Sequence, residues 1–166
     1  MEIREVRPEE FGEAGQITAL AYSEFAREPR GWDSWSEYLE QIADIGGRAQ
    51  RTLVLGAFEE GRVLGTVTLE LDDVIGDDDA ELPAGTSVIR MLGVDPARRG
   101  QGIGLALVEA CIDRARRAGK SVITLRTTSH MIAAQRLYTA AGFEREPQRD
   151  QRFEDGLVLM SFRLEL

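Results

Sequence analysis

A short run of glycine and arginine residues carries the clearest chemical signal in this sequence. Glycine occupies every second position from 100 to 104, and Arg98 and Arg99 come directly before it. An apolar pattern with helical spacing begins at Ile103, so the run lies where a helix exposes unpaired N–H groups. Glycine leaves the backbone open to a ligand, and arginine adds charge and forked donors. The run therefore predicts a phosphate-binding turn, with a solvated arginine pair before an ordinary helix as the alternative.

The elements that hold this run are predicted from the spacing of apolar residues. Residues 88–94 alternate as a strand, and Asp95 and Pro96 end it because proline cannot continue a ladder. The helix carries a small or apolar residue at every fourth position over 103–115, and Gly119 stands where a C-cap belongs. The local order is thus strand, turn, basic glycine loop and helix.

Two other phosphate-binding loops were compared with this run. A P-loop ends in Gly-Lys-Ser/Thr, whereas Gly104 is followed by Leu105. A dinucleotide fingerprint needs G-x-G-x-x-G after an early strand and an acidic residue on the next strand. Here the spacing is G-x-G-x-G, and residues 121–126 carry no carboxylate. A dinucleotide-binding oxidoreductase is kept only as a third hypothesis. Protection of the protein against thermal melting by NAD(P), but not by coenzyme A, would support it.

Two motifs resemble those of the GCN5-related N-acetyltransferases (GNAT). Residues 99–104, R-G-Q-G-I-G, match the family's R/Q-x-x-G-x-G/A loop. The preceding L-G-V-D-P at 92–96 fits the apolar-x-Val-x-Pro strand end. Residues 134–143, A-Q-R-L-Y-T-A-A-G-F, resemble the family's A-x-x-L-Y-x-x-x-G-F helix end. Two motifs in the right order and spacing are more specific than either alone.

The resemblance implies an N-acetyltransferase that transfers acetyl from acetyl-CoA to a primary amine by direct attack in a ternary complex. The acceptor would be a small molecule, or an N-terminal or lysine amine, and no metal is expected. Backbone groups at the end of the central strand would pair with the pantetheine arm, and the pyrophosphate would lie on the glycine loop. A non-catalytic acetyl-CoA-binding module is the alternative. The implied cofactor-binding residues are Leu92, Gly93, Val94, Arg99, Gly100, Gln101, Gly102, Ile103 and Gly104.

The resemblance also implies a catalytic acid but leaves the base open. Tyr138 matches the family's acid tyrosine, and a phenol with a pKa of about 10 keeps its proton at neutral pH. Packing of this tyrosine against the sheet is the alternative. Many relatives carry a basic glutamate on the central strand, but the plausible positions here are Val88 and Arg90. Either Glu70 or Glu81 acts through water, or the amine enters neutral.

The resemblance and the apolar pattern together predict an α/β fold. It is a GNAT-like acyl-CoA N-acyltransferase fold, with a mixed six- to seven-stranded sheet flanked by helices and a splayed parallel strand pair. Thr127, Thr128 and Ser129 are the N-cap candidates for the helix that carries Tyr138. The strands are expected at residues 2–7, 52–58, 63–71, 88–94, 121–126, 143–146 and 157–164, and the helices at 8–22, 34–46, 103–118 and after 129.

Composition limits the function classes further. The 166 residues are predicted to form one N-acetyltransferase domain, residues 1–166, and 43% hydrophobic and 30% charged residues are typical of a soluble globular protein. A net charge of −9 argues against nucleic acid and anionic membranes as partners, and a cytoplasmic location follows as the default. A homodimer stays open. The single cysteine, Cys111, excludes an internal disulfide, and the acidic stretch 72–85 is expected to be a solvated loop rather than a calcium site.

Overall fold

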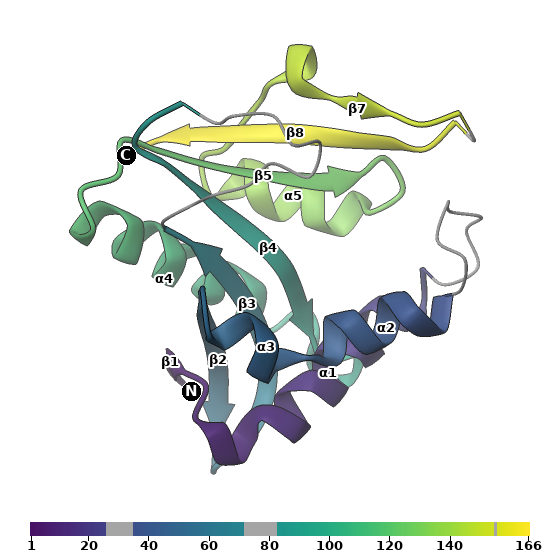
Figure 1. Cartoon of the computed structure of the whole chain (residues 1–166), viewed down its shortest axis with the longest axis vertical. Coiled ribbons are helices and arrows are strands. Elements are labelled where there is room, and N and C mark those ends of the chain that lie inside the picture. The colour runs from purple at the N-terminus through teal and green to yellow at the C-terminus, as the bar shows by residue number, and fades with distance from the viewer. Residues whose placement is uncertain (26–34, 72–82, 155) are drawn as a thin grey trace. The chain divides into compact units, whose positions relative to one another are not determined.

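A computed structural model of the chain describes residues 1–25, 35–71, 83–154 and 156–166 (Figure 1). Its internal contacts group into two compact units. The first contains Met1–Thr68 and Met91–Leu107, and the second contains Leu69–Arg90 and Val108–Leu166. Three elements run through both units: the strands β3 (Arg62–Glu70) and β4 (Thr86–Val94) and the helix α4 (Ile103–Arg117).

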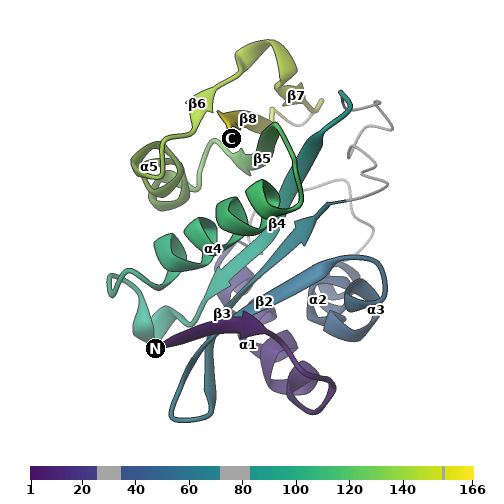
Figure 2. The ribbon, with the colours of Figure 1, turned by 90° about the vertical axis from the view of Figure 1, so that its left-hand side faces the viewer.

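The first unit joins an antiparallel strand set to three helices. Its strands follow the hydrogen-bonded order β1-β2-β3-β4, and β1 pairs with β2 from Glu2↔Phe58 to Glu5↔Leu55. Figure 2 shows α1, α2 and α3 together beside β2. Besides parts of β3, β4 and α4, its elements are β1 (Glu2–Glu5), η1 (Pro8–Glu10), α1 (Phe11–Ser23), α2 (Trp35–Ala43), α3 (Ile45–Ala49), β2 (Leu53–Glu59) and η2 (Pro96–Arg98).

The core of this unit lies where α1 and α3 cover β2 and β3. The helix predicted over residues 8–22 buries an apolar face here: Ala14 is fully buried, and Phe11 and Ile17 pack beside it. The single helix predicted over 34–46 is instead two helices. Asp44 leaves helical geometry, and its carboxylate accepts the Gly47 N–H at 2.8 Å as the N-cap of α3. The core cluster consists of Val6, Ala14, Ile45, Val54, Phe58 and Val63.

The second unit is organised around β8. Its strands follow the order β4-β5-β8-β6, and β7 also pairs with β8. The pair β4–β5 is parallel, whereas β5, β6 and β7 are all antiparallel to β8. Besides parts of β3, β4 and α4, its elements are β5 (Val122–Thr128), α5 (Ile132–Ala140), β6 (Glu144–Arg145), η3 (Pro147–Arg149), β7 (Gln151–Arg152) and β8 (Val158–Glu165).

The predicted fold class, a mixed sheet flanked by helices, is confirmed. Across the described residues the strands number eight rather than six to seven, because the segment 144–152 forms two strands of two residues each. The stripe predicted for α4 is buried at Ile103, Leu107, Cys111 and Ala115. These residues are four apart, so one face of the helix turns inward over its whole length.

The N-cap predicted for α5 is wrong. Residues up to Thr128 stay in β5, where Thr128 pairs with Leu159 of β8, so strand pairing prevails over capping here. The helix α5 begins at Ile132, and its N-cap residue Met131 makes no side-chain capping bond. Most of the acidic stretch 72–85 lies outside the described residues. Among the described helices, none is long and apolar enough to cross a membrane.

Candidate functional site

The turn between β4 and α4 is built by a capping aspartate and a proline. Asp95 Oδ1 accepts the Ala97 N–H at 2.9 Å, which starts the short helix η2 at Pro96. The strand therefore ends at Asp95 and Pro96, as predicted. After η2 the backbone passes through Gly100 at φ 77° and Gly102 at φ 78°. Such values favour glycine, because a Cβ would crowd the following carbonyl.

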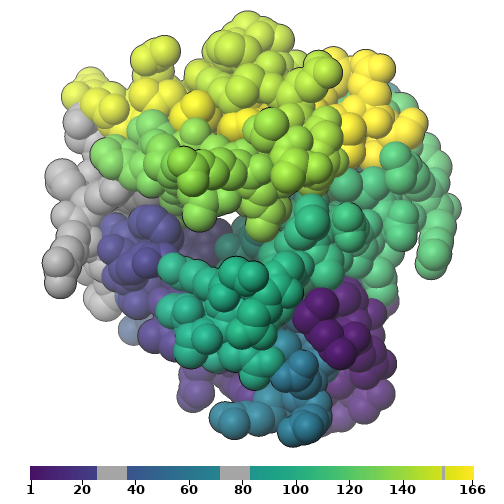
Figure 3. All heavy atoms as spheres, turned by 180° about the vertical axis from the view of Figure 1, so that it is seen from behind, coloured from purple at the N-terminus to yellow at the C-terminus, as the bar shows by residue number. Residues whose placement is uncertain are grey.

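Backbone N–H groups of this turn are available to a ligand. The first bond into α4 is the one from Ala106 N to Gly102 O, at 3.0 Å. Within the part of the chain that is described, the N–H groups of residues 102–105 donate to no other residue. A Cβ built on Gly100 or Gly102 would meet nothing within 4 Å, so the space over the turn is open. We call residues 99–104 the anion turn; Figure 3 shows it, in teal, at the molecular surface.

The two arginines of the turn already have carboxylate partners. Arg99 Nη2 lies 2.6 Å from Glu24 Oε1, just beyond α1, and donates to Ala21 O at 3.3 Å. Arg98 forms an ion pair with Glu59 at the end of β2. The bond from Arg98 lowers the pKa of the Glu59 carboxyl, so Glu59 is charged at neutral pH. The sequence predicted that Arg98 and Arg99 begin the turn, but it did not predict their carboxylate partners.

The remaining polar and apolar residues of the turn have distinct places. Gln101 Oε1 accepts from Arg98 Nε at 3.2 Å, so part of its amide is used within the turn. Ile103 is buried and anchors the first turn of α4 in the core. Gly104 is also buried, unlike the exposed Gly100 and Gly102. The open backbone therefore lies before α4 rather than along its first turn.

Gly93, the middle residue of the predicted pantetheine-binding segment, lies under α1. A Cβ built on Gly93 would lie 3.1 Å from Ala21 Cβ and 3.3 Å from Thr18 Cα. A Cβ on the neighbouring Gly65 of β3 would lie 2.7 Å from Gly93 O. Close packing of β3 and β4 thus requires glycine at Gly65, and α1 leaves little space for a side chain at Gly93. The predicted pairing of Leu92, Gly93 and Val94 with a ligand is a separate property and stays a prediction.

The parallel strands β4 and β5 pair along only part of their length. Their register runs from Thr86↔Val122 to Ile89↔Leu125, although β4 continues to Val94. The pairing ends two residues before Met91, whose φ of 50° is unusual for a strand residue. The alternation predicted over residues 88–94 is interrupted at this point. The printed pairing therefore stops before β4 ends, and the predicted splay of this strand pair stays a prediction.

Tyr138, the predicted acid, is a buried residue of α5 in the second unit. Its ring lies 6.1 Å from that of Phe143 in an edge-on contact and 6.0 Å from that of Phe162. Burial raises the pKa of Tyr138 well above its ordinary value of about 10, and nearby Cys111 raises it further. The phenol therefore holds its proton throughout the physiological range, as an acid must.

The two glutamates considered as bases differ in what the structure describes. Glu70 Oε1 lies 2.8 Å from Arg90 Nε. Arg90 is on the central strand β4, at one of the two positions considered for the family's glutamate. The carboxylate is thus engaged by a guanidinium rather than free to accept a proton. Glu81 lies outside the described residues. The other central-strand position, Val88, is buried and apolar.

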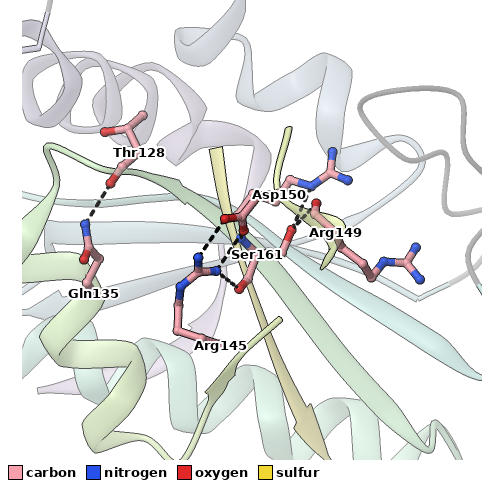
Figure 4. Close-up of polar contacts among 7 residues, drawn as sticks. Thr128, Gln135, Arg145, Arg149, Asp150 and Ser161 are labelled. Atoms are coloured by element: carbon pink, nitrogen blue, oxygen red, sulfur yellow. Dashed lines mark hydrogen bonds and ion pairs between the residues drawn. The ribbon is translucent and has the colours of Figure 1, made fainter. Parts of the chain in front are cut away.

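A second polar cluster, which the sequence did not reveal, holds β8. Arg145 donates from two nitrogens to Asp150, and Asp150 Oδ1 accepts the Ser161 N–H at 2.8 Å (Figure 4). Ser161 Oγ donates to Arg149 O at 2.6 Å and accepts from Arg126 Nε at 3.3 Å. In the sequence only the charged residues in 145–152 indicate this cluster, and its other members, Ser161 and Arg126, come from β8 and β5.

Gln135 contacts the backbone that precedes α5. Its Nε2 donates to Thr128 O at 3.0 Å and to Ser129 O at 3.1 Å (Figure 4). The amide thereby ties α5 to the end of β5, on the helix that carries Tyr138. Among the described residues, no group of three or more histidine, cysteine, aspartate or glutamate side chains could hold a metal ion.

Comparison with known proteins gives consistent matches. The model of the acetyltransferase (GNAT) family matches residues 16–143. The structure of yncA from Salmonella typhimurium, with its cofactor acetyl-CoA, is 25% identical, covers 99% of this chain and 93% of its own, and has a TM-score of 0.70. A GNAT family acetyltransferase from Brucella melitensis in complex with acetyl-CoA is 28% identical over 86% of this chain and 82% of its own, with a TM-score of 0.62.

One curated relative matches over a shorter stretch. The mycothiol acetyltransferase of Sanguibacter keddieii is 47% identical over 57 residues, which are 34% of this chain. The match spans 18% of that relative's length.

Proposed function

This chain belongs to the GNAT acetyltransferase family, and from that premise we propose that it transfers the acetyl group of acetyl-CoA to a primary amine. The acceptor is a small molecule, or an N-terminal or lysine amine, and residues 1–166 act as one N-acetyltransferase domain. Two solved structures, 25% and 28% identical to this chain, both contain acetyl-CoA, which supports the proposed cosubstrate. The observation that carries the proposal is the run of free N–H groups over the anion turn.

The anion turn fits the diphosphate of acetyl-CoA. Two left-handed glycines and open space above them would let phosphate oxygens approach the N–H groups of residues 102–105. These groups also lie at the positive end of α4, a helix of 15 residues. Leu92, Gly93 and Val94 would pair with the pantetheine arm as a neighbouring strand would. Bound acetyl-CoA would supply the thioester carbon that the amine attacks.

Most of the rate enhancement comes from holding the two substrates together. Correct placement of two reactants is worth up to about 7–11 kcal/mol of the barrier in ideal cases. Tyr138 Oη holds the proton that the departing sulfur takes up, since a thiolate with a pKa of about 8.5 leaves more easily when it is protonated. The raised pKa of Tyr138 keeps that proton available.

The acceptor amine enters as the neutral base in this proposal. An alkyl amine has a pKa near 10, so a small fraction is neutral at pH 7. Glu70 is paired with Arg90, which leaves it no simple role in taking the proton. The amine therefore loses one proton to solvent before it attacks. After the attack the nitrogen loses a second proton, and uptake of a proton returns Tyr138 to its neutral form.

A thiol-release assay with acetyl-CoA over a panel of amines tests the proposal. We expect turnover by the wild type and a loss of kcat of about 10²-fold or more in Tyr138→Phe, with the KM for acetyl-CoA nearly unchanged. Thr139→Val is the matched control, because it removes a hydroxyl from the exposed face of the same helix. Both variants are checked for folding by urea unfolding.

Two outcomes contradict the proposal. Acetyl-CoA binding without turnover on any amine would make the chain a binding module rather than an enzyme. Equal kcat values for wild type and Tyr138→Phe would remove the acid role from Tyr138 and leave the residue with packing alone.

A further inference from the structure

The anion turn is electrostatically tied to α1 through one ion pair. Arg99 Nη2 lies 2.6 Å from Glu24 Oε1 and donates to Ala21 O at 3.3 Å. Both side chains are partly exposed, at 41% and 45%. The guanidinium that the turn offers to an anion is therefore shared with a carboxylate of the protein itself.

The backbone of α1 that precedes Glu24 is firmly placed against β3 and β4. Because Gly93 has no side chain, Thr18 and Ala21 lie close to β4: a Cβ at Gly93 would be 3.1 Å from Ala21 Cβ and 3.3 Å from Thr18 Cα. The Thr18 hydroxyl donates its only proton to Ala14 O, at 2.7 Å. In the 2.5 Å contact between the Thr18 and Thr66 hydroxyls, Thr66 is therefore the donor. Both hydroxyls are buried. The helix cannot easily retreat, so any release of Arg99 must come from the Glu24 side chain.

Glu24 stands at an unfavourable end of its helix. It is the C-cap residue of α1, where unpaired carbonyls already create negative potential, and the last turn of α1 carries no basic residue. A carboxylate here gains its stabilisation from Arg99, which comes from a distant part of the sequence. An anion that binds Arg99 more strongly than Glu24 does would take that cation away.

We propose that Glu24 sets the affinity of the anion turn by competing with the diphosphate of acetyl-CoA for Arg99. This inference rests on the proposed function, because it takes the diphosphate to lie on the turn. Binding exchanges the Glu24 contact for phosphate contacts at the same guanidinium, so each coenzyme molecule binds less tightly than the bare turn would allow. By linkage, occupancy of the turn and the Glu24–Arg99 pair oppose each other.

Calorimetric titration with coenzyme A and, separately, with inorganic pyrophosphate tests this competition. We expect Glu24→Gln to bind coenzyme A about two- to fivefold more tightly than the wild type, the range that an exposed ion pair can supply. Glu9→Gln is the matched control, since it removes one negative charge from an exposed residue before α1. In an Arg99→Ala background, Glu24→Gln should change the affinity by less than about 1.5-fold.

Each outcome of this experiment decides something. Coenzyme A binding that is unchanged or weakened in Glu24→Gln overturns the competition and leaves the proposed function standing. Equal tightening in Glu9→Gln also overturns it, because net charge alone then explains the effect. Failure of the wild type to bind either coenzyme A or pyrophosphate overturns both this inference and the anion turn.

Discussion

Asp150 and Arg145 form a two-pronged ion pair at the edge of the second unit. Asp150 Oδ1 lies 2.9 Å from Arg145 Nη1, and Oδ2 lies 2.8 Å from Nη2. The aspartate side chain is only 6% exposed, and it also accepts the backbone N–H of Ser161 in β8. One carboxylate thus joins β6, the following loop and the long strand β8.

Asp150→Asn should therefore be strongly destabilising. It removes the charge from a buried pair and leaves Arg145 without its partner, so we expect a loss of about 2–4 kcal/mol in the free energy of unfolding at pH 7. Urea unfolding measures the loss. Asp113→Asn, at an exposed position of α4, should change the stability by less than about 0.5 kcal/mol. Equal losses of unfolding free energy in the two variants would show that the Asp150–Arg145 pair does not stabilise the fold.

The carboxylate of Glu10 should make the free energy of unfolding of the first unit depend on pH. Its carboxylate receives two bonds from Arg4, at 2.6 and 2.8 Å, and the Arg4 bond lowers the pKa of Glu10 to about 2. A lowered carboxyl pKa stabilises the fold above its unfolded value of about 4.5, and that stability is lost as pH falls toward 2. Glu10→Gln should cost about 1–2 kcal/mol at pH 7.

The difference between wild type and Glu10→Gln should shrink as the pH of urea unfolding is lowered from 5 to 3. Glu9→Gln again serves as the control, because Glu9 is exposed. A difference that stays constant over this pH range would show that the Glu10 carboxylate is not preferentially charged in the folded state.

Gly102→Val should abolish coenzyme A binding while the chain still folds. The β-branched side chain would fill the open space over the turn and strain a backbone at φ 78°, at a cost of about 1–2 kcal/mol of stability. Gly119→Val is the matched control, since Gly119 has φ 72° and equally open surroundings at the other end of α4. It should lose similar stability and keep coenzyme A binding, as calorimetry and urea unfolding would show. Tight binding by Gly102→Val would refute the anion turn.

The pH dependence of kcat/KM should follow the acceptor rather than the protein. If the amine attacks in its neutral form, the rate should rise tenfold per pH unit up to the pKa of each amine tested. Burial raises the pKa of Tyr138 above 10, so no fall from loss of its proton is expected below that pH. Initial rates for two amines of different pKa measure this. A midpoint near neutral pH that is identical for both amines would instead point to a protein base.

The sequence was most informative where one short segment determines its own structure. The buried stripe of α4, the break at Asp95 and Pro96, and the positive φ of Gly119 and Gly142 were all expected from local residue types. These features depend on spacing and backbone sterics within a few residues. The family resemblance added the mixed sheet and its parallel strand pair, which local patterns alone do not give.

What the sequence missed depends on contacts between distant segments. No residue near Arg99 in the sequence predicts its ion pair with Glu24, because that pair depends on the packing of α1 on Gly93. Thr128 has the side chain of a good N-cap, but its place opposite Leu159 keeps it in a strand. Strands of two residues, such as β6 and β7, are too short to show any periodicity.

The burial of Cys111 affects how the protein would respond to the disulfide form of coenzyme A, the thiol product of the proposed reaction. It is the single cysteine of the chain, it has no exposed surface, and burial raises the pKa of its thiol to about 12. Only a thiolate attacks a disulfide, and burial keeps the Cys111 thiol protonated at pH 7. Under the proposed function, a cell whose coenzyme pool becomes oxidised would therefore not inactivate this acetyltransferase by forming a mixed disulfide with it.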